Sequence, residues 1–139
     1  MSYDLLVFDL EKAPREQTEF MQWYDQQTEW EEDHNYQEVS VCSERLKAWF
    51  MEMITFYPPM NGSLAPSDDE IDEWDENDDP RYSQVTDYSL GREVIYMAFA
   101  WSVADEAYAK CKALAEKHGV GFFNASGNPG EIMYYDLPA

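Results

Sequence analysis

The chain has few basic residues, only two cysteines and no long apolar run. Its 139 residues include 9 Lys and Arg against 29 Asp and Glu, which gives a net charge of −20. Such a charge repels nucleic acids and anionic membranes and attracts basic proteins. No apolar stretch is long enough to span a bilayer, and residues 1–14 lack the basic start of a secretory signal. We therefore expect a cytoplasmic protein that binds neither nucleic acid nor membrane.

Signatures of catalysis are also missing. The sequence contains no Gly-x-Ser-x-Gly, no phosphate-binding loop and no Gly-x-Gly-x-x-Gly. Cys111 and His118 share one face of an expected helix, but a core thiol and a helix-terminal histidine explain them better. Cys42 and Cys111 are far apart in the sequence, and we expect two buried thiols rather than a disulfide. We predict no enzymatic activity and no cofactor.

The dense carboxylates raise the question of a metal site. A calcium-binding EF-hand loop that began at Asp75 would have Pro80 where the turn needs Gly and Thr86 where the last ligand should be Glu. His34 has acidic neighbours, but no second His or Cys lies at the spacing of zinc ligands. We therefore predict no dedicated metal site.

The hydrophobic pattern predicts one α+β domain over residues 1–139. A chain of this length can bury one core, and aromatic residues make up 16% of it. The expected order is β-α-α-(acidic loop)-β-β-α-β-β, a mainly antiparallel sheet of about five strands with three helices on one face. Strands are expected at 3–10, 85–90, 94–101, 120–125 and 131–137, helices at 14–30, 43–57 and 104–118, and a turn at 127–130. Ser43, a capping box at 102–105 and Gly119 are the expected helix-end signals.

Most of the negative charge lies in the first part of the chain. Residues 1–80 carry 22 acids and 4 bases, a net charge of −18, whereas residues 81–139 carry a net charge of only −2. Nine of the thirteen residues in 67–79, SDDEIDEWDENDD, are carboxylates. Because like charges repel, we expect this run to form an extended acidic surface loop at about 63–80. A second acidic segment lies between Arg15 and Arg45, where nine acids and no base occur.

Two tryptophans occur within these acidic segments. Interface hot spots are rich in Trp, and charge around them accelerates association. Trp74 and Trp30 could anchor a partner. Alternatively, Trp30 could pack in the core and Trp74 could merely anchor its own loop, and the sequence leaves both interpretations open. The predicted partner-binding residues are Asp68, Asp69, Glu70, Asp72, Glu73, Trp74, Asp75, Glu76, Glu29, Trp30, Glu31, Glu32 and Asp33.

Several segments resemble a known family. They are FMQWYDQQTEWEEDHNY, YPPMNG, DYSLG, IYMAFAWSVADEAY and LAEKHGVGFFNASGNPGEI. Together they are similar to small acidic bacterial proteins that resemble the immunity proteins of polymorphic secreted toxin systems. The resemblance covers most of the chain apart from the acidic run, and its segments carry no catalytic motif.

The resemblance implies a cytoplasmic immunity-type protein that binds and neutralises a basic toxin domain. Charge and missing motifs agree with that role, since an acidic surface could occlude a basic protein. A general acidic protein-binding module or a nucleic-acid mimic is the alternative, and a small enzyme or metal-binding domain is a third possibility.

The net charge predicts a salt-dependent stability. Raising the salt concentration from about 10 to about 300 mM should raise the melting temperature by a few degrees, because screening weakens self-repulsion. Thermal unfolding followed by circular dichroism measures this shift. A melting temperature that falls or stays constant would contradict the prediction.

Overall fold

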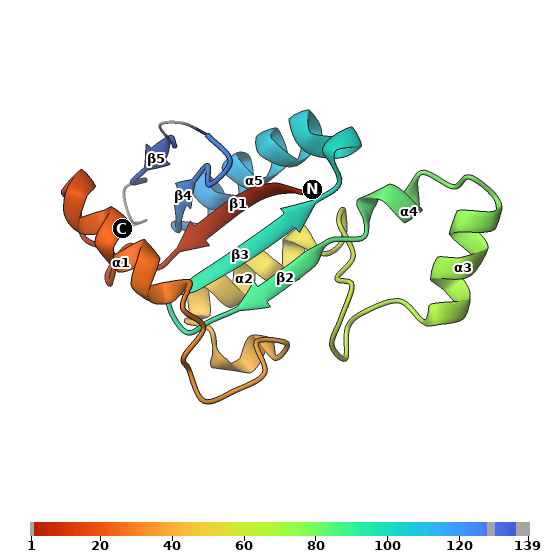
Figure 1. Cartoon of the computed structure of the whole chain (residues 1–139), viewed down its shortest axis with the longest axis horizontal. Helices are drawn as coiled ribbons and strands as arrows, with labels where there is room; N and C mark the ends of the chain where they lie inside the picture. Colours follow the sequence, from red (N-terminus) through yellow and green to blue (C-terminus); the bar gives the residue numbers. More distant parts are fainter. Residues whose placement is uncertain (1, 128–129, 136–139) are drawn as a thin grey trace.

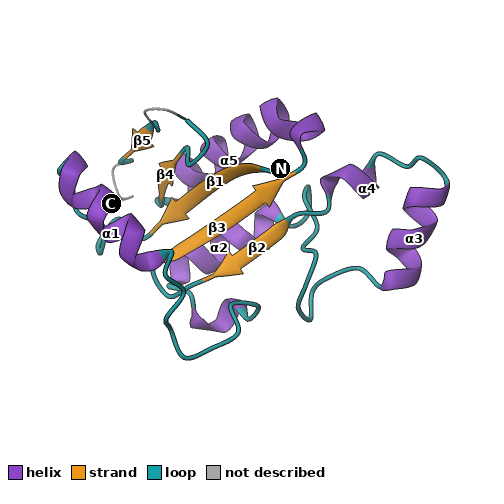
Figure 2. Cartoon of the chain, in the orientation of Figure 1, coloured by secondary structure: helices purple, strands orange, loops and turns teal. Residues whose placement is uncertain are grey.

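A five-stranded antiparallel sheet forms the centre of the computed structural model, which describes residues 2–127 and 130–135. The strands are β1 (Tyr3–Phe8), β2 (Asp87–Leu90), β3 (Val94–Phe99), β4 (Gly121–Phe123) and β5 (Ile132–Met133), in the spatial order β2-β3-β1-β4-β5. The helices are α1 (Gln17–Gln27), α2 (Glu44–Met53), α3 (Asp68–Glu76), α4 (Arg81–Gln84) and α5 (Ala104–His118), with 3-10 turns η1 (Val39–Val41) and η2 (Trp101–Val103) (Figures 1 and 2). The predicted α+β class with a mainly antiparallel sheet is confirmed.

The central strand β1 is buried on both faces. It pairs with β3 along its whole length and with β4 over its second half. Leu5 and Val7 belong to one hydrophobic core, whereas Leu6 and Phe8 belong to the other, and all four are fully buried. Because neighbouring residues of a strand point to opposite faces, β1 requires cover on both sides of the sheet.

Helices α2 and α5 cover the face of Leu5 and Val7. Trp49 of α2 is fully buried there, and its indole N–H donates to the carbonyl oxygen of Cys111 in α5 at 3.3 Å. This bond satisfies the polar atom of the largest ring in the core. The helices therefore form one layer behind the sheet in the view of Figure 1.

Helix α1 packs on the opposite face, so the prediction of three helices on one face is wrong. Phe20 of α1 is fully buried, with its ring centroid 5.0 Å from that of Phe8 and 5.3 Å from that of Phe123. The reason is the apolar second face of β1, which the aromatic stripe of α1 covers. Figure 1 shows α1 crossing the front of the sheet while α2 and α5 lie behind it.

The predicted helix ends are partly correct. Gly119 ends α5 in the left-handed conformation, with φ 69°, and Ser43 occupies the N-cap position of α2, although its hydroxyl makes no capping bond. Helix α1 starts later than expected because Glu16, three residues before Glu19, accepts the N–H of Glu19 at 2.9 Å. The capping box at 102–105 is wrong, since residue 102 belongs to η2 and Val103 takes the N-cap position.

The acidic run also differs from its prediction. The expected extended loop at about 63–80 is wrong in its central part, where α3 forms a helix that α4 follows at 81–84. The predicted turn at 127–130 and the end of the last predicted strand include residues 128–129 and 136–137, which lie outside the described residues.

A close approach of backbone and ring at Gly121 gives a test of the sheet packing. A Cβ atom at Gly121 would lie 2.1 Å from Cε2 of Phe8, its cross-strand partner. Gly121→Ala should therefore lower the free energy of unfolding by about 1–3 kcal/mol through overpacking. Phe8→Leu should relieve the clash, so the double variant should be more stable than the sum of the single effects. Additive effects in urea unfolding would contradict this packing.

Candidate protein-binding surface

Helix α3 converts the acidic run into an ordered surface. The Ser67 hydroxyl caps the helix by accepting the N–H of Glu70 at 3.1 Å. Acids in the first turn interact favourably with the positive helix end, which offsets part of their mutual repulsion. Ile71 and Trp74, one turn apart, are the half-buried side chains of this helix. The remaining side chains of α3 are exposed carboxylates: Asp68, Asp69, Glu70, Asp72, Glu73, Asp75 and Glu76.

One basic residue holds the end of this helix. The Arg81 guanidinium forms a two-pronged pair with Asp79, with Nη2 2.7 Å from Oδ2, and its centre lies 4.9 Å from the ring centroid of Trp74. Trp74 therefore anchors α3 to α4 within its own chain, which favours the loop-anchor interpretation of this residue. No described residue makes a salt bridge to the exposed carboxylates of α3.

Residues 61–85, which carry α3 and are called the excursion below, are closed at their base by two backbone hydrogen bonds. Buried Thr86 donates its N–H to the carbonyl oxygen of Pro58 at 2.9 Å and accepts the N–H of Met60 at 2.8 Å. These bonds join the two ends of the excursion to each other and to the start of β2. The base of the segment that carries the acidic helix is thus fixed at the start of β2.

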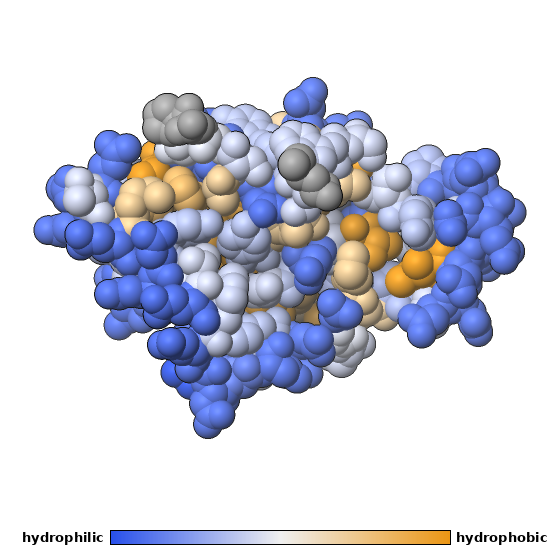
Figure 3. Space-filling model, viewed as in Figure 1, coloured by the Kyte–Doolittle hydropathy of each residue, from blue (hydrophilic) through white to orange (hydrophobic). Residues whose placement is uncertain are grey.

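An apolar groove separates α3 and α4 from the sheet. It has a volume of about 280 Å³ and is lined by Met60, Ile71, Tyr82, Ser83, Val85 and Ala100. Met60 is 48% exposed and Trp101, next to Ala100, is 53% exposed, which is unusual for large apolar residues. In Figure 3 hydrophobic surface gathers where α3 and α4 meet the body, beside the hydrophilic surface of α3.

No pattern in the sequence indicates this groove. Its residues are spread from position 60 to position 100, and each has the appearance of ordinary core or loop sequence. Only the return of the chain through α4 and β3 brings them together. Carboxylates beside an exposed apolar groove form a surface suited to a basic partner that also carries apolar side chains.

The second predicted segment, residues 29–33, folds differently. Glu29, Glu31 and Asp33 are exposed, whereas Trp30 and Glu32 are half-buried. Trp30 adopts φ 56°, and its ring packs edge-on against Tyr36 and Tyr96. The core-packing interpretation of Trp30 therefore holds for part of its ring.

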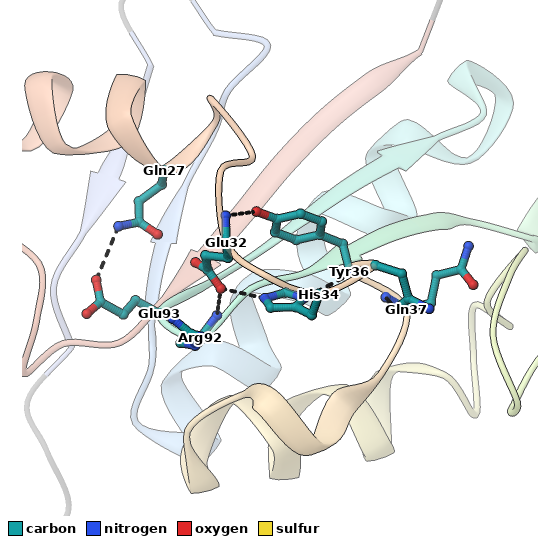
Figure 4. Close-up of polar contacts among 8 residues, drawn as sticks. Gln27, Glu32, His34, Tyr36, Gln37, Arg92 and Glu93 are labelled. Carbon is teal, nitrogen blue, oxygen red and sulfur yellow. Dashed lines mark hydrogen bonds and ion pairs between the residues drawn. The ribbon is translucent and has the colours of Figure 1, made fainter.

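A network of polar contacts fixes the loop that follows (Figure 4). Glu32 Oε1 lies 2.6 Å from His34 Nε2 and accepts the backbone N–H of Arg92 at 3.1 Å. The N–H of Tyr36 donates to His34 Nδ1 at 3.1 Å, so Nε2 carries the proton that points to Glu32. Glu32 and His34 thereby hold the loop to the β2–β3 turn, and both ring nitrogens of His34 are used in these contacts.

The two acidic segments do not form one surface. The loop of Glu32 attaches at Arg92, just before β3, whereas the groove beside α3 includes Ala100, just after β3. Six strand residues separate these ends, a span of about 20 Å. The structure thus places Asp68–Glu76 and Glu29–Asp33 at opposite ends of the sheet.

The two cysteines are buried, and His118 is paired with Glu52. Cys42 and Cys111 are free and buried, and burial raises the pKa of the Cys42 thiol to about 12 and that of Cys111 well above its ordinary value. Neither is a thiolate at neutral pH, the form that acts as a nucleophile. His118 Nε2 contacts Glu52 Oε1 at 2.8 Å and so links α5 to α2.

Two further observations concern residues 2–127 and 130–135 alone. No three His, Cys, Asp or Glu side chains in this part converge on a possible metal position. Its helices are all too short or too polar to cross a bilayer.

The Arg81 corner predicts a specific pH response. Hydrogen bonds from Arg81 lower the pKa of Asp79 below its ordinary value of 3.8. Because the folded pKa is lowered, the pair stabilises the corner above pH 3.8 and loses this contribution as the pH falls through the lowered pKa. Arg81→Gln should raise the Asp79 midpoint toward its ordinary value, measured by carboxyl NMR, whereas the control Arg92→Gln should leave it unchanged. An Asp79 midpoint that Arg81→Gln does not move would contradict the pairing.

Comparisons with known proteins provide no identification. No protein-family model matches the chain, and searches of curated proteins and of solved structures likewise find no match.

Proposed function

We propose that this chain is a protein-binding inhibitor that docks on a basic protein domain through helix α3 and the groove beside it. In the biological setting that its sequence resemblance implies, the partner is a toxin domain and the chain is the cytoplasmic immunity-type protein that neutralises it. The observation that carries the proposal is that seven exposed carboxylates, which make no salt bridge to any residue of 2–127 and 130–135, lie beside an exposed apolar groove.

The negative charge of the chain attracts a basic partner before the two proteins touch. With a net charge of −18 on residues 1–80, a basic partner is attracted over distances comparable to the screening length of about 10 Å at 0.1 M salt. An acidic surface of this kind accelerates encounter more than it strengthens the final complex.

The apolar side chains in and beside the groove stabilise the complex once it has formed. Met60, Tyr82 and Trp101 are 46–53% exposed, so a partner that covers them gains apolar burial without rearrangement of the core. Helix α3 and four of the six groove residues belong to the excursion, whose two ends are joined by hydrogen bonds, and this limits the ordering cost on binding. Inhibition then follows by occlusion, because a bound domain of this size covers the partner's basic surface.

A four-residue neutralisation tests the steering. Asp72→Asn, Glu73→Gln, Asp75→Asn and Glu76→Gln remove charge from the later part of α3, where acids are unfavourable for the helix dipole. The wild-type chain should capture a basic protein from a lysate of the source organism. The quadruple variant should associate with that protein about tenfold more slowly at low salt.

A matched control makes the same charge change elsewhere. Glu11→Gln, Asp25→Asn, Glu38→Gln and Glu116→Gln alter exposed acids that make no salt bridge among the described residues. This control should keep most of the association rate, whereas Met60→Ser with Tyr82→Ser should mainly accelerate dissociation. If both charge variants slowed association equally, α3 would not be the docking site. Capture of many basic proteins in competition with DNA would indicate a nucleic-acid mimic instead.

A further inference from the structure

Half of one sheet face remains open. The hydrophobic cluster under α1 contains residues of β1, β4 and β5 and only Val94 and Tyr96 of β3. In Figure 1 most of β3 and β2 faces the viewer without a covering helix. Asp87 and Ser89 alternate with the buried Tyr88 and Leu90, so their side chains point to this open face.

A pocket of about 250 Å³ lies there. Its lining comes from α1, the following loop and the strands: Tyr24, Thr28, Trp30, Asp87, Ser89, Tyr96 and Ala98. The strand register places Asp87 opposite Ala98 and Ser89 opposite Tyr96. The small side chain of Ala98 leaves the space between these larger neighbours.

Aromatic rings form the walls. The ring of Trp30 stands nearly perpendicular to that of Tyr96, at 85°, with centroids 5.9 Å apart. The ring of Tyr36 also packs against that of Trp30, with ring centroids 5.2 Å apart. Burial raises the pKa of both Tyr24 and Tyr96, so these phenols stay neutral.

Asp87 belongs to the pocket lining, whereas Asp4 lies outside it and is bonded to Tyr96. Asp4 accepts from the Ser2 hydroxyl with one oxygen and from the Tyr96 hydroxyl with the other. Asp87 is exposed at the rim, and its carboxylate has no hydrogen-bond or ion-pair partner among residues 2–127 and 130–135. Neither Lys nor Arg belongs to the pocket lining.

We propose that this pocket binds an organic cation, the guanidinium or alkylammonium group of a basic ligand. A cation over aromatic faces is stabilised by the ring quadrupoles, and Asp87 can accept its N–H donors. An anion would meet the Asp87 carboxylate and no Lys or Arg of this lining. The pocket is large enough for the end of one side chain, and its volume lies below the range of pockets that bind larger ligands. The inference depends on the pocket lining and is independent of α3.

NMR titration of the full ¹⁵N-labelled chain tests the site. The probes are N-acetyl-arginine methylamide, a basic side chain in a peptide setting, and tetramethylammonium, a free small cation, both in about 150 mM salt. We expect saturable shifts of the Trp30 indole N–H, assigned from Trp30→Phe, and of the Ala98 amide. Tighter binding of the arginine probe points to a partner's side chain as the source, and tighter binding of tetramethylammonium points to a free small cation.

Matched controls separate this site from general attraction. The neutral citrulline analogue of the arginine probe should bind at least about tenfold more weakly, and Asp87→Asn should weaken arginine binding by about tenfold. Asp69→Asn, an equal charge change on α3, should leave it unchanged. Both variants should keep the dispersed spectrum of the folded chain. Linear shifts that spread over α3, or equal binding of citrulline and arginine, would overturn the proposal.

Discussion

The burial of β1 on both faces is the constraint on which the rest of the structure depends. Leu5 to Phe8 have no exposed surface, so cover is required in front of the sheet and behind it. Helices α2 and α5 supply one cover and the aromatic stripe of α1 supplies the other. None of these contacts has room for an unpaired carboxylate, since burying such a charge is very costly. The negative charge is therefore confined to helix surfaces and to segments outside the two cores, chiefly the excursion at 61–85 and the loop after α1.

This separation divides the chain into an apolar double core and an acidic periphery. The clamp of Thr86 with Pro58 and Met60 joins the two ends of the excursion, and Ile71 places α3 at the edge of the groove. At the other end of β3, the contacts of Glu32 with His34 and Arg92 fix the loop that carries Trp30. Charge therefore acts from ordered elements at both ends of the sheet, and each end offers a different chemistry. An apolar groove adjoins α3, whereas aromatic rings and Asp87 line the open face.

Sequence patterns predicted the strands and the long helices because each has a clear apolar period that packing later satisfies. Val94–Phe99 is an interior strand, and Gly119 ends α5. The side of the sheet on which α1 packs could not be predicted, because a helical stripe does not state which face it covers. The helix of residues 68–76 was not predicted, because repulsion between its carboxylates indicates an extended chain. The Ser67 cap and the contact of Trp74 with Arg81 stabilise the helix against this repulsion. The exposed acids of the candidate surface were visible in the sequence. Met60, Tyr82 and Asp87 were not, since only the fold brings them to the groove and the pocket.

If α3 meets a basic partner as described, this helix must be ordered in the free chain. Native-state amide hydrogen exchange at low and moderate salt measures this order, since exchange slows where helical hydrogen bonds persist. We expect the amides of Ile71 to Asn77 to be protected in the unbound protein, and we expect Arg81→Gln to reduce this protection. Exchange of these amides at the rate of an unstructured chain, with or without Arg81, would contradict this expectation. The acidic run would then be an extended segment without a fixed place beside the groove.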